Sequence, residues 1–132
     1  VIQFAFDSRE ESDYLPHNYE KNCVVYTGTH DNDTLCGWYK VLDPEDLKLS
    51  QKYMNNANTP KRQIHWDFIR LALASVADLC IIPLQDYLGL GSEARINTPS
   101  TLGNNWRWRM TQGCLTKELA DQIRELTTLY GR

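Results

Sequence analysis

The sequence contains no long apolar run, no cluster of basic residues and no closely spaced pair of cysteines. No stretch approaches the roughly 20 consecutive apolar residues that a membrane-spanning helix requires. The 14 Lys and Arg residues are scattered and are outnumbered by 17 Asp and Glu, so the formal net charge is −3. We therefore expect neither a membrane protein nor a nucleic-acid-binding protein, because nucleic-acid binding requires a basic face.

The cysteines are also far apart, whereas a structural zinc site uses closely spaced pairs. They are Cys23, Cys36, Cys80 and Cys114. We expect no metal and no cofactor. Cys23 and Cys80 stand in apolar runs, which is typical of small buried thiols. The pattern favours a reducing compartment, which we expect to be the cytoplasm or alternatively a plastid.

The 132 residues, 42% of them hydrophobic, are enough for one domain with a core. The sequence shows no repeats, no low-complexity tract and no second domain. It starts without Met and directly with an apolar run, whereas the ends of natural domains are usually polar. We therefore expect residues 1–132 to be a single partial domain, cut from a longer protein.

Strand-forming and helix-forming segments alternate along the chain. Strands are predicted at residues 1–6, 23–27 and 79–84, the last as a parallel strand buried on both faces. Helices are predicted at residues 35–41, after the Asp43-Pro44 and Thr59-Pro60 cap signals, and from Thr116 to Gly131. The helix after Pro60 has an apolar face that extends to Ser75 and Val76. Strands separated by long crossovers imply parallel pairing and the α/β class.

Polar residues follow each predicted strand, and in parallel α/β folds these strand ends form the active face. Asp7 follows the first strand, residues 30–33 (HDND) follow the second, and Asp86 follows the third. Asp7 and Asp86 taken singly are also ordinary turn residues. One alternative for His30, Asp31 and Asp33 is a metal-dependent hydrolase, but no second His stands nearby. A carboxylate that contacts a polyhydroxylated substrate fits better.

Several aromatic residues have two interpretations. Trp38 could line a sugar site, because aromatic rings offer an apolar face to ring C–H groups, or it could belong to the core. Residues 106–109 (WRWR) alternate aromatic and basic side chains. This alternation occurs in single-strand nucleic-acid binding, but the acidic balance favours Trp106 and Trp108 packing inward under the Arg stems.

Four segments resemble a known family, in the family's order and over nearly the whole chain. They are residues 15–19 (LPHNY), 24–34 (VVYTGTHDNDT), 85–97 (QDYLGLGSEARIN) and 106–109 (WRWR). These segments resemble motifs of the amylomaltases, also called disproportionating enzymes or 4-α-glucanotransferases, of glycoside hydrolase family 77. Ser100 and an additional Asn before Trp106 depart from the family pattern. These departures affect the expected course of the last loop and not the assignment to the family.

The resemblance implies a fold and an activity. The family fold is a (β/α)₈ barrel, and this chain would supply about its last three strand–helix units and its C-terminal helix. The family reaction is a retaining transfer of α-1,4-glucan segments between maltooligosaccharides. It uses a nucleophilic Asp, a Glu that is first acid and then base, and a third Asp that binds the sugar hydroxyls.

The resemblance also assigns individual residues. Asp31 matches the third, transition-state-stabilising carboxylate, His30 its neighbour at the donor sugar, and Asn97 a substrate contact in the last loop. Glu93 belongs to that loop and is expected to have a structural role. Nothing in this chain matches the nucleophile or the acid/base Glu, which belong to the missing N-terminal part. The chain alone is therefore expected to be inactive. The alternative is a non-catalytic glucan-binding module or a decayed fragment.

Overall fold

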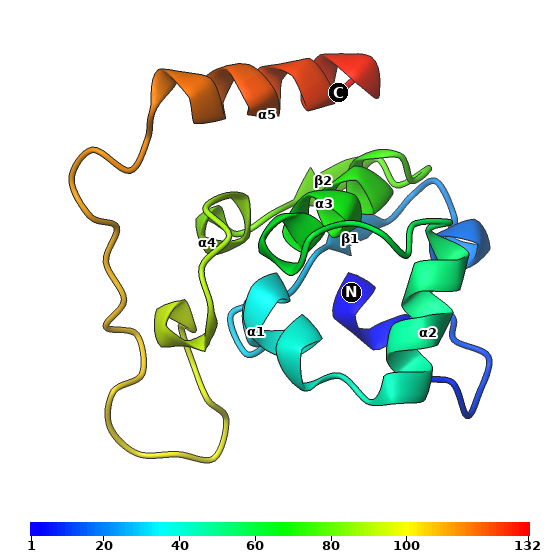
Figure 1. Ribbon diagram of the computed structural model, residues 1–132, viewed down its shortest axis with the longest axis horizontal. Helices are drawn as coiled ribbons and strands as arrows, with labels where there is room; N and C mark the ends of the chain where they lie inside the picture. The colour runs from blue at the N-terminus through cyan, green and yellow to red at the C-terminus, as the bar shows by residue number, and fades with distance from the viewer.

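The computed structural model describes all 132 residues, in a helix-rich α/β arrangement around one pair of strands (Figure 1). The strands are β1 (Val24–Tyr26) and β2 (Leu79–Ile81). The α-helices are α1 (Leu35–Val41), α2 (Pro44–Tyr53), α3 (Ile64–Leu73), α4 (Leu84–Tyr87) and α5 (Lys117–Leu129). Short 3₁₀ helices are η1 (Ile2–Phe4), η2 (Pro16–Asn18), η3 (Lys61–Gln63) and η4 (Ser92–Ala94).

The two strands pair in parallel, with Val25 opposite Cys80. The chain between them forms α1, α2 and α3, so the connection is a long helical crossover of the kind that parallel pairing requires. The predicted α/β class and two of the three predicted strands are thereby confirmed. The carboxyl ends of β1 and β2 lie at the same edge. The loop at residues 28–34 follows β1 directly, and the segment 88–97 follows β2 after the short helix α4.

The first predicted strand is wrong, because residues 2–4 form the 3₁₀ helix η1. Only one main-chain bond, from Gln3 N–H to Thr27 O at 3.3 Å, connects this segment to the region of β1. Turning the backbone places Ile2, Ala5 and Phe6 together in the core, whereas an extended chain would direct Ala5 to the face opposite Ile2 and Phe6. The hydrophobic spacing thus favours the turn in the absence of a neighbouring strand.

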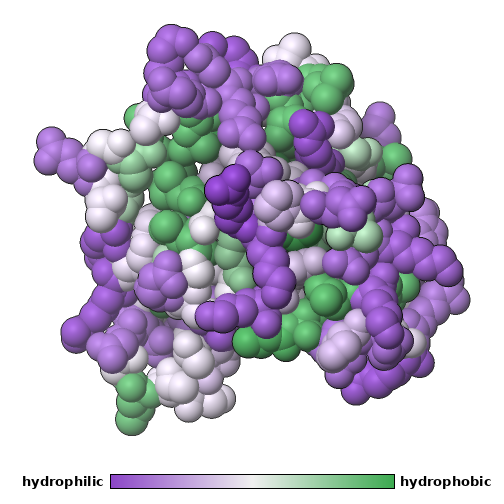
Figure 2. Space-filling model, in the orientation of Figure 1, coloured by the Kyte–Doolittle hydropathy of each residue, from purple (hydrophilic) through white to green (hydrophobic).

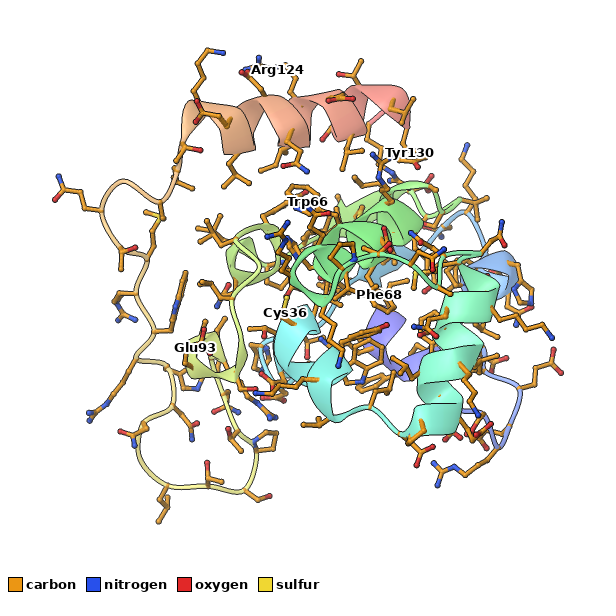
Figure 3. The ribbon with its side chains drawn as sticks, viewed as in Figure 1. Cys36, Trp66, Phe68, Glu93, Arg124 and Tyr130 are labelled. Atoms are coloured by element: carbon orange, nitrogen blue, oxygen red, sulfur yellow. The ribbon has the colours of Figure 1, made fainter.

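Phe68 on α3 lies at the centre of the core and is completely buried. Its ring makes edge-to-face contacts with Phe6, Trp38 and Tyr39, with centroids 5.7, 5.2 and 5.8 Å apart. Figure 3 shows the Phe68 side chain pointing into the space between α1, α2 and η1. These aromatic pairs connect the N-terminal segment, α1 and α3 into one unit. Trp38 is thereby part of the core boundary, as one of its two interpretations stated.

Two of the three predicted caps mark helix starts correctly. Asp43 and Thr116 accept main-chain N–H bonds at the starts of α2 and α5. Thr34, which was not predicted as a cap, does the same at the start of α1. The start predicted from Thr59-Pro60 is displaced, since η3 comes first and α3 begins at Ile64. That helix also ends at Leu73, so Ser75 and the exposed Val76 lie beyond its apolar face.

The prediction that β2 is buried on both faces is wrong for this chain. Leu79 is 52% exposed, Ile81 is 40% exposed, and Val24 on β1 is 43% exposed. A sheet of two strands has no further layer over these positions. Figure 2 shows apolar residues reaching the surface in patches between hydrophilic ones.

The last helix lies at one side of the molecule, at the end of the long irregular segment 95–116 (Figure 1). Its apolar face contacts α3, and Leu126 is its one buried residue. Arg132 donates to the carbonyls of Leu73 and Ser75, both at 2.8 Å, which attaches the chain end to α3. Gly131 has φ +68° and ends the helix as predicted. None of the helices has the length and apolar character needed to cross a bilayer.

Candidate active site

A tight turn after β1 presents His30 and Asp31 to solvent. Asn32 Oδ1 accepts from the main-chain N–H and the hydroxyl of Thr29, at 2.9 and 2.8 Å. Asn32 N–H in turn donates to Thr29 O at 3.2 Å. This closed turn leaves the side chains of His30 and Asp31 53% and 48% exposed. Within the HDND run, Asn32 therefore builds the turn, and His30 and Asp31 present their side chains to solvent.

The loop after α4 brings Asn97 against this turn. Asn97 Nδ2–H donates to Asp31 Oδ1 at 2.6 Å, across 66 residues of sequence. His30 Nε2 lies 3.3 Å from the same oxygen. The main-chain N–H of Asn97 also donates to His30 O at 3.1 Å. The structure thus brings together three of the predicted site residues: His30, Asp31 and Asn97.

Arg95 connects the two loops by hydrogen bonds to their main-chain carbonyls. Its Nη2–H donates to Asp31 O at 2.7 Å, and its Nε–H donates to Asn97 O at 2.8 Å. Both acceptors are main-chain carbonyls, so the guanidinium positions backbone and leaves the Asp31 carboxylate accessible. Arg95 was not among the predicted site residues. Its position two residues before Asn97 is the one sequence feature that indicated a role near the site.

Trp106 covers the other side of His30. The two ring centroids lie 5.0 Å apart with an interplanar angle of 35°. Trp106 is 57% exposed, so the prediction that its ring packs into the core is wrong. The long loop carries Trp106 past the turn instead of beneath the sheet. The sequence shows the alternation of aromatic and basic residues, but it does not show that Trp106 contacts His30.

Asp33 points away from the pair. Its Oδ2 accepts from Ser92 Oγ–H at 2.6 Å and its Oδ1 from Thr34 N–H at 2.8 Å. Asp33 therefore connects the turn to η4 and does not join His30 and Asp31. No group of three or more His, Cys, Asp or Glu side chains in the molecule is arranged to hold a metal ion.

Asp86 is almost fully buried and supports the site from within. Its two oxygens accept from Thr27 Oγ1–H at 2.6 Å and from Leu35 N–H at 2.8 Å. Burial raises the pKa of Asp86, while these two hydrogen bonds partly oppose the rise. The carboxyl thus connects the end of β1 with the start of α1, which are the two ends of the His30–Asp31 turn. This is a structural role.

A cysteine–histidine pair lies between α1 and α3. Cys36 Sγ is 3.7 Å from His65 Nδ1. Burial raises the pKa of the Cys36 thiol and lowers the pKa of His65. Both changes favour the neutral forms, so the pair is not an activated nucleophile.

The remaining predicted contacts, Asp7 and Trp38, lie elsewhere. They share a hollow of about 510 Å³ between η1, the polar loop at 7–14, α1 and α2. Asp7 binds Arg9 through hydrogen bonds of 2.8 and 2.6 Å. These bonds lower the pKa of Asp7 to about 2. The structure therefore does not place Asp7 or Trp38 among the residues that line the Asp31 group.

Glu93 lies on η4 (Figure 3), and its Oε1 accepts from Gly91 N–H at 2.9 Å. The expected structural role of Glu93 is consistent with this contact within its own loop.

A parallel sheet with polar side chains gathered beyond the carboxyl ends of its strands is the arrangement of α/β enzymes. The chain is therefore part of a protein of that class.

Comparison with known proteins identifies the family. Residues 1–116 match the sequence model of the 4-alpha-glucanotransferase family. The 4-alpha-glucanotransferase of Clostridium butyricum is 50% identical over 133 residues, which is 100% of this chain and 27% of that protein. The chloroplastic/amyloplastic 4-alpha-glucanotransferase DPE1 of Arabidopsis thaliana is 47% identical, over 100% of this chain and 23% of that protein.

A solved structure agrees. The amylomaltase from Streptococcus agalactiae in complex with acarbose superposes with a TM-score of 0.92 at 36% identity, covering 100% of this chain and 26% of that one. The chain belongs to the 4-alpha-glucanotransferase family. It spans about a quarter of the length of the curated relatives it matches.

Proposed function

We propose that this chain is part of a retaining 4-alpha-glucanotransferase, which transfers α-1,4-glucan segments between maltooligosaccharides, and that Asp31 stabilises the transition state. The observation that carries the proposal is the Asp31–Asn97 hydrogen bond at 2.6 Å. It joins two loops 66 residues apart and gathers a carboxylate, an amide and an imidazole at the carboxyl edge of the sheet. Such groups together match the alternating donors and acceptors of a sugar ring.

The chemistry proposed for each residue follows from its donors and acceptors. Asp31 accepts hydrogen bonds from two adjacent sugar hydroxyls, and these bonds tighten as the ring flattens towards an oxocarbenium-like state. Asn97 holds one carboxylate oxygen and keeps a carbonyl free for a hydroxyl. His30 supplies one further contact to the donor sugar. All three act on positions of the sugar away from the bond that breaks.

Two further carboxylates are required for the double displacement, a nucleophilic Asp and an acid/base Glu. We place them outside this chain, since no residue of this chain matches their motifs. Residues 1–132 would then be one partial domain, contributing its strand units to a (β/α)₈ barrel. The exposed apolar positions Val24, Leu79 and Ile81 support this arrangement, because a larger barrel would cover them.

Asp7 and Trp38 remain proposals as more distant substrate contacts. Their hollow combines aromatic faces and carboxylates, which is suitable chemistry for a glucan. A hydroxyl reaching Asp7 would replace its bonds to Arg9. For the compartment, we propose the cytoplasm, with a plastid as the alternative that the plant relatives' names suggest.

The test is a chimera in which this chain replaces the matching segment of the Clostridium butyricum relative. Disproportionation of maltotriose is followed by the release of glucose. Asp31→Asn removes the negative charge at nearly constant shape, so kcat should fall about 10³-fold, which corresponds to roughly 4 kcal/mol of transition-state stabilisation. Asp78→Asn, at an exposed carboxylate without side-chain partners, is the matched control and should leave kcat unchanged.

The chain by itself should release no glucose from maltotriose. Glucose formation by the isolated chain, or full activity of Asp31→Asn in the chimera, would contradict the proposal. A folded chimera that binds maltotriose but transfers nothing would favour the second candidate, a non-catalytic glucan-binding or decayed fragment. The exposed apolar face of the sheet counts against this second candidate, because no part of this chain covers it.

A further inference from the structure

Trp106 makes a contact with the site that the proposed chemistry does not use. Its ring covers one face of the His30 imidazole, with centroids 5.0 Å apart. His30 lies at the end of a surface turn, and its side chain is 53% exposed. An imidazole on such a turn samples several side-chain rotamers unless a neighbour restricts it. Trp106 is the aromatic ring that lies against it.

The backbone of Trp106 is firmly placed. Its N–H donates to Ile96 O at 2.7 Å, beside Asn97. Its carbonyl accepts from Arg109 Nη1–H at 3.1 Å. Trp106 has φ +63°, a left-handed conformation that is costly for a bulky residue and persists only where surrounding contacts hold it. These contacts direct a large ring onto His30 from a segment with little regular structure.

His30 is fixed from its other sides by the site itself. Its carbonyl accepts from Asn97 N–H at 3.1 Å, and its Nε2 lies 3.3 Å from Asp31 Oδ1. The backbone contact leaves side-chain rotation free, and the contact with Asp31 constrains a single ring atom. The indole, which lies against the imidazole at an interplanar angle of 35°, is therefore the contact that can restrict the ring to one rotamer.

We propose that Trp106 is a positioning residue for the transfer reaction, which holds the His30 imidazole in the rotamer that faces the donor sugar beside Asp31. This inference rests on the proposed function. Trp106 acts through His30 and is not itself assigned a contact with the reacting atoms. Its loss should lower kcat and leave the binding of ground-state substrate almost unchanged, because orientation matters most in the transition state.

The experiment uses the same chimera and maltotriose. Trp106→Ala should lower kcat about tenfold, with KM changed less than about twofold. Trp106→Phe keeps an aromatic face and should restore kcat to within about threefold of the parent. Leu102→Ala, at a fully exposed position on the same loop, is the matched control and should change neither constant.

A double-mutant cycle separates positioning from a general structural role. In a His30→Ala background, Trp106→Ala should have no further effect on kcat, because the ring that it positions is gone. Additive losses, equal losses for the Ala and Phe variants, or an unchanged kcat in Trp106→Ala would overturn the inference. If Asp31→Asn also loses activity in that last case, the proposed function stands without this inference. If Asp31→Asn stays fully active, the proposed function itself fails.

Discussion

Replacing Asp86 should loosen the start of α1 and with it the turn that carries His30 and Asp31. Asp86→Ala removes the acceptor of two buried donors, Thr27 Oγ1–H and Leu35 N–H. Both donor residues are completely buried, so water does not replace the lost partner. Each orphaned donor costs about 1–3 kcal/mol. A combined cost of about 3 kcal/mol corresponds to roughly a 150-fold faster local opening.

Hydrogen exchange measured by mass spectrometry on the chimera reports this opening directly. Peptides that cover the start of α1 should exchange about two orders of magnitude faster in Asp86→Ala than in the parent. Peptides from α5 should exchange at the parental rate, since that helix contacts α3. Asp86→Asn keeps an oxygen for Leu35 N–H, and the Thr27 hydroxyl can rotate to accept from the amide. The Asn variant should therefore cost about 1 kcal/mol or less.

The pH dependence provides a second check. Because burial raises the folded-state pKa of Asp86 above the ordinary value of 3.8, the folded state binds the proton more tightly than the unfolded state. Asp86 therefore contributes stability that is fully present below pH 3.8 and is lost as the pH rises through the folded pKa. Relative to Asp86→Asn at each pH, local protection of the parent should increase as the pH falls towards 4. If the ratio of parental protection to Asp86→Asn protection does not change with pH, or falls as the pH is lowered, the reasoning is refuted.

Two further predictions concern packing. Phe68→Ala removes the ring at the centre of the core, which is completely buried, and should cost about 3–5 kcal/mol, measured as faster exchange across α1 and α3. Parental protection would show that Phe68 does not hold these helices together. Gly89→Ala places a Cβ 2.8 Å from His65 Cε1 at a φ of +63°, so the loop leading to Asn97 should lose about 1–3 kcal/mol of local stability. Unchanged exchange in residues 88–97 would contradict that estimate.

Much of the local structure could be predicted because its causes are local. Thr34, Asp43 and Thr116 cap helices through hydrogen bonds to main-chain N–H groups two or three residues away. Residues 79–81 of the apolar run at 79–84 and residues 24–26 of the β-branched run at 23–27 form the paired strands β2 and β1. The displaced start of α3 shows the limit of this approach, because a cap signal marks a turn of helix without specifying its type.

The errors share a different cause. Residues 1–6 have strand-forming composition but no strand beside them, so their apolar side chains are buried by a 3₁₀ turn instead. Leu79 and Ile81 look like core residues, yet their exposure depends on a layer that this chain does not contain. Burial is a property of the surroundings, which a sequence pattern does not describe.

The sequence by itself determined the elements, the HDND turn after a strand, and the family resemblance that pointed to His30, Asp31 and Asn97. Only the tertiary structure decided how these residues meet. Parallel pairing of β1 with β2 brings two loops to one edge, where Asn97 reaches Asp31 and Arg95 ties their backbones. It also placed Trp106 on His30 and Asp86 beneath the turn. Such contacts join residues about 50 to 75 positions apart in the sequence. Local conformational preferences do not specify which distant side chains come into contact.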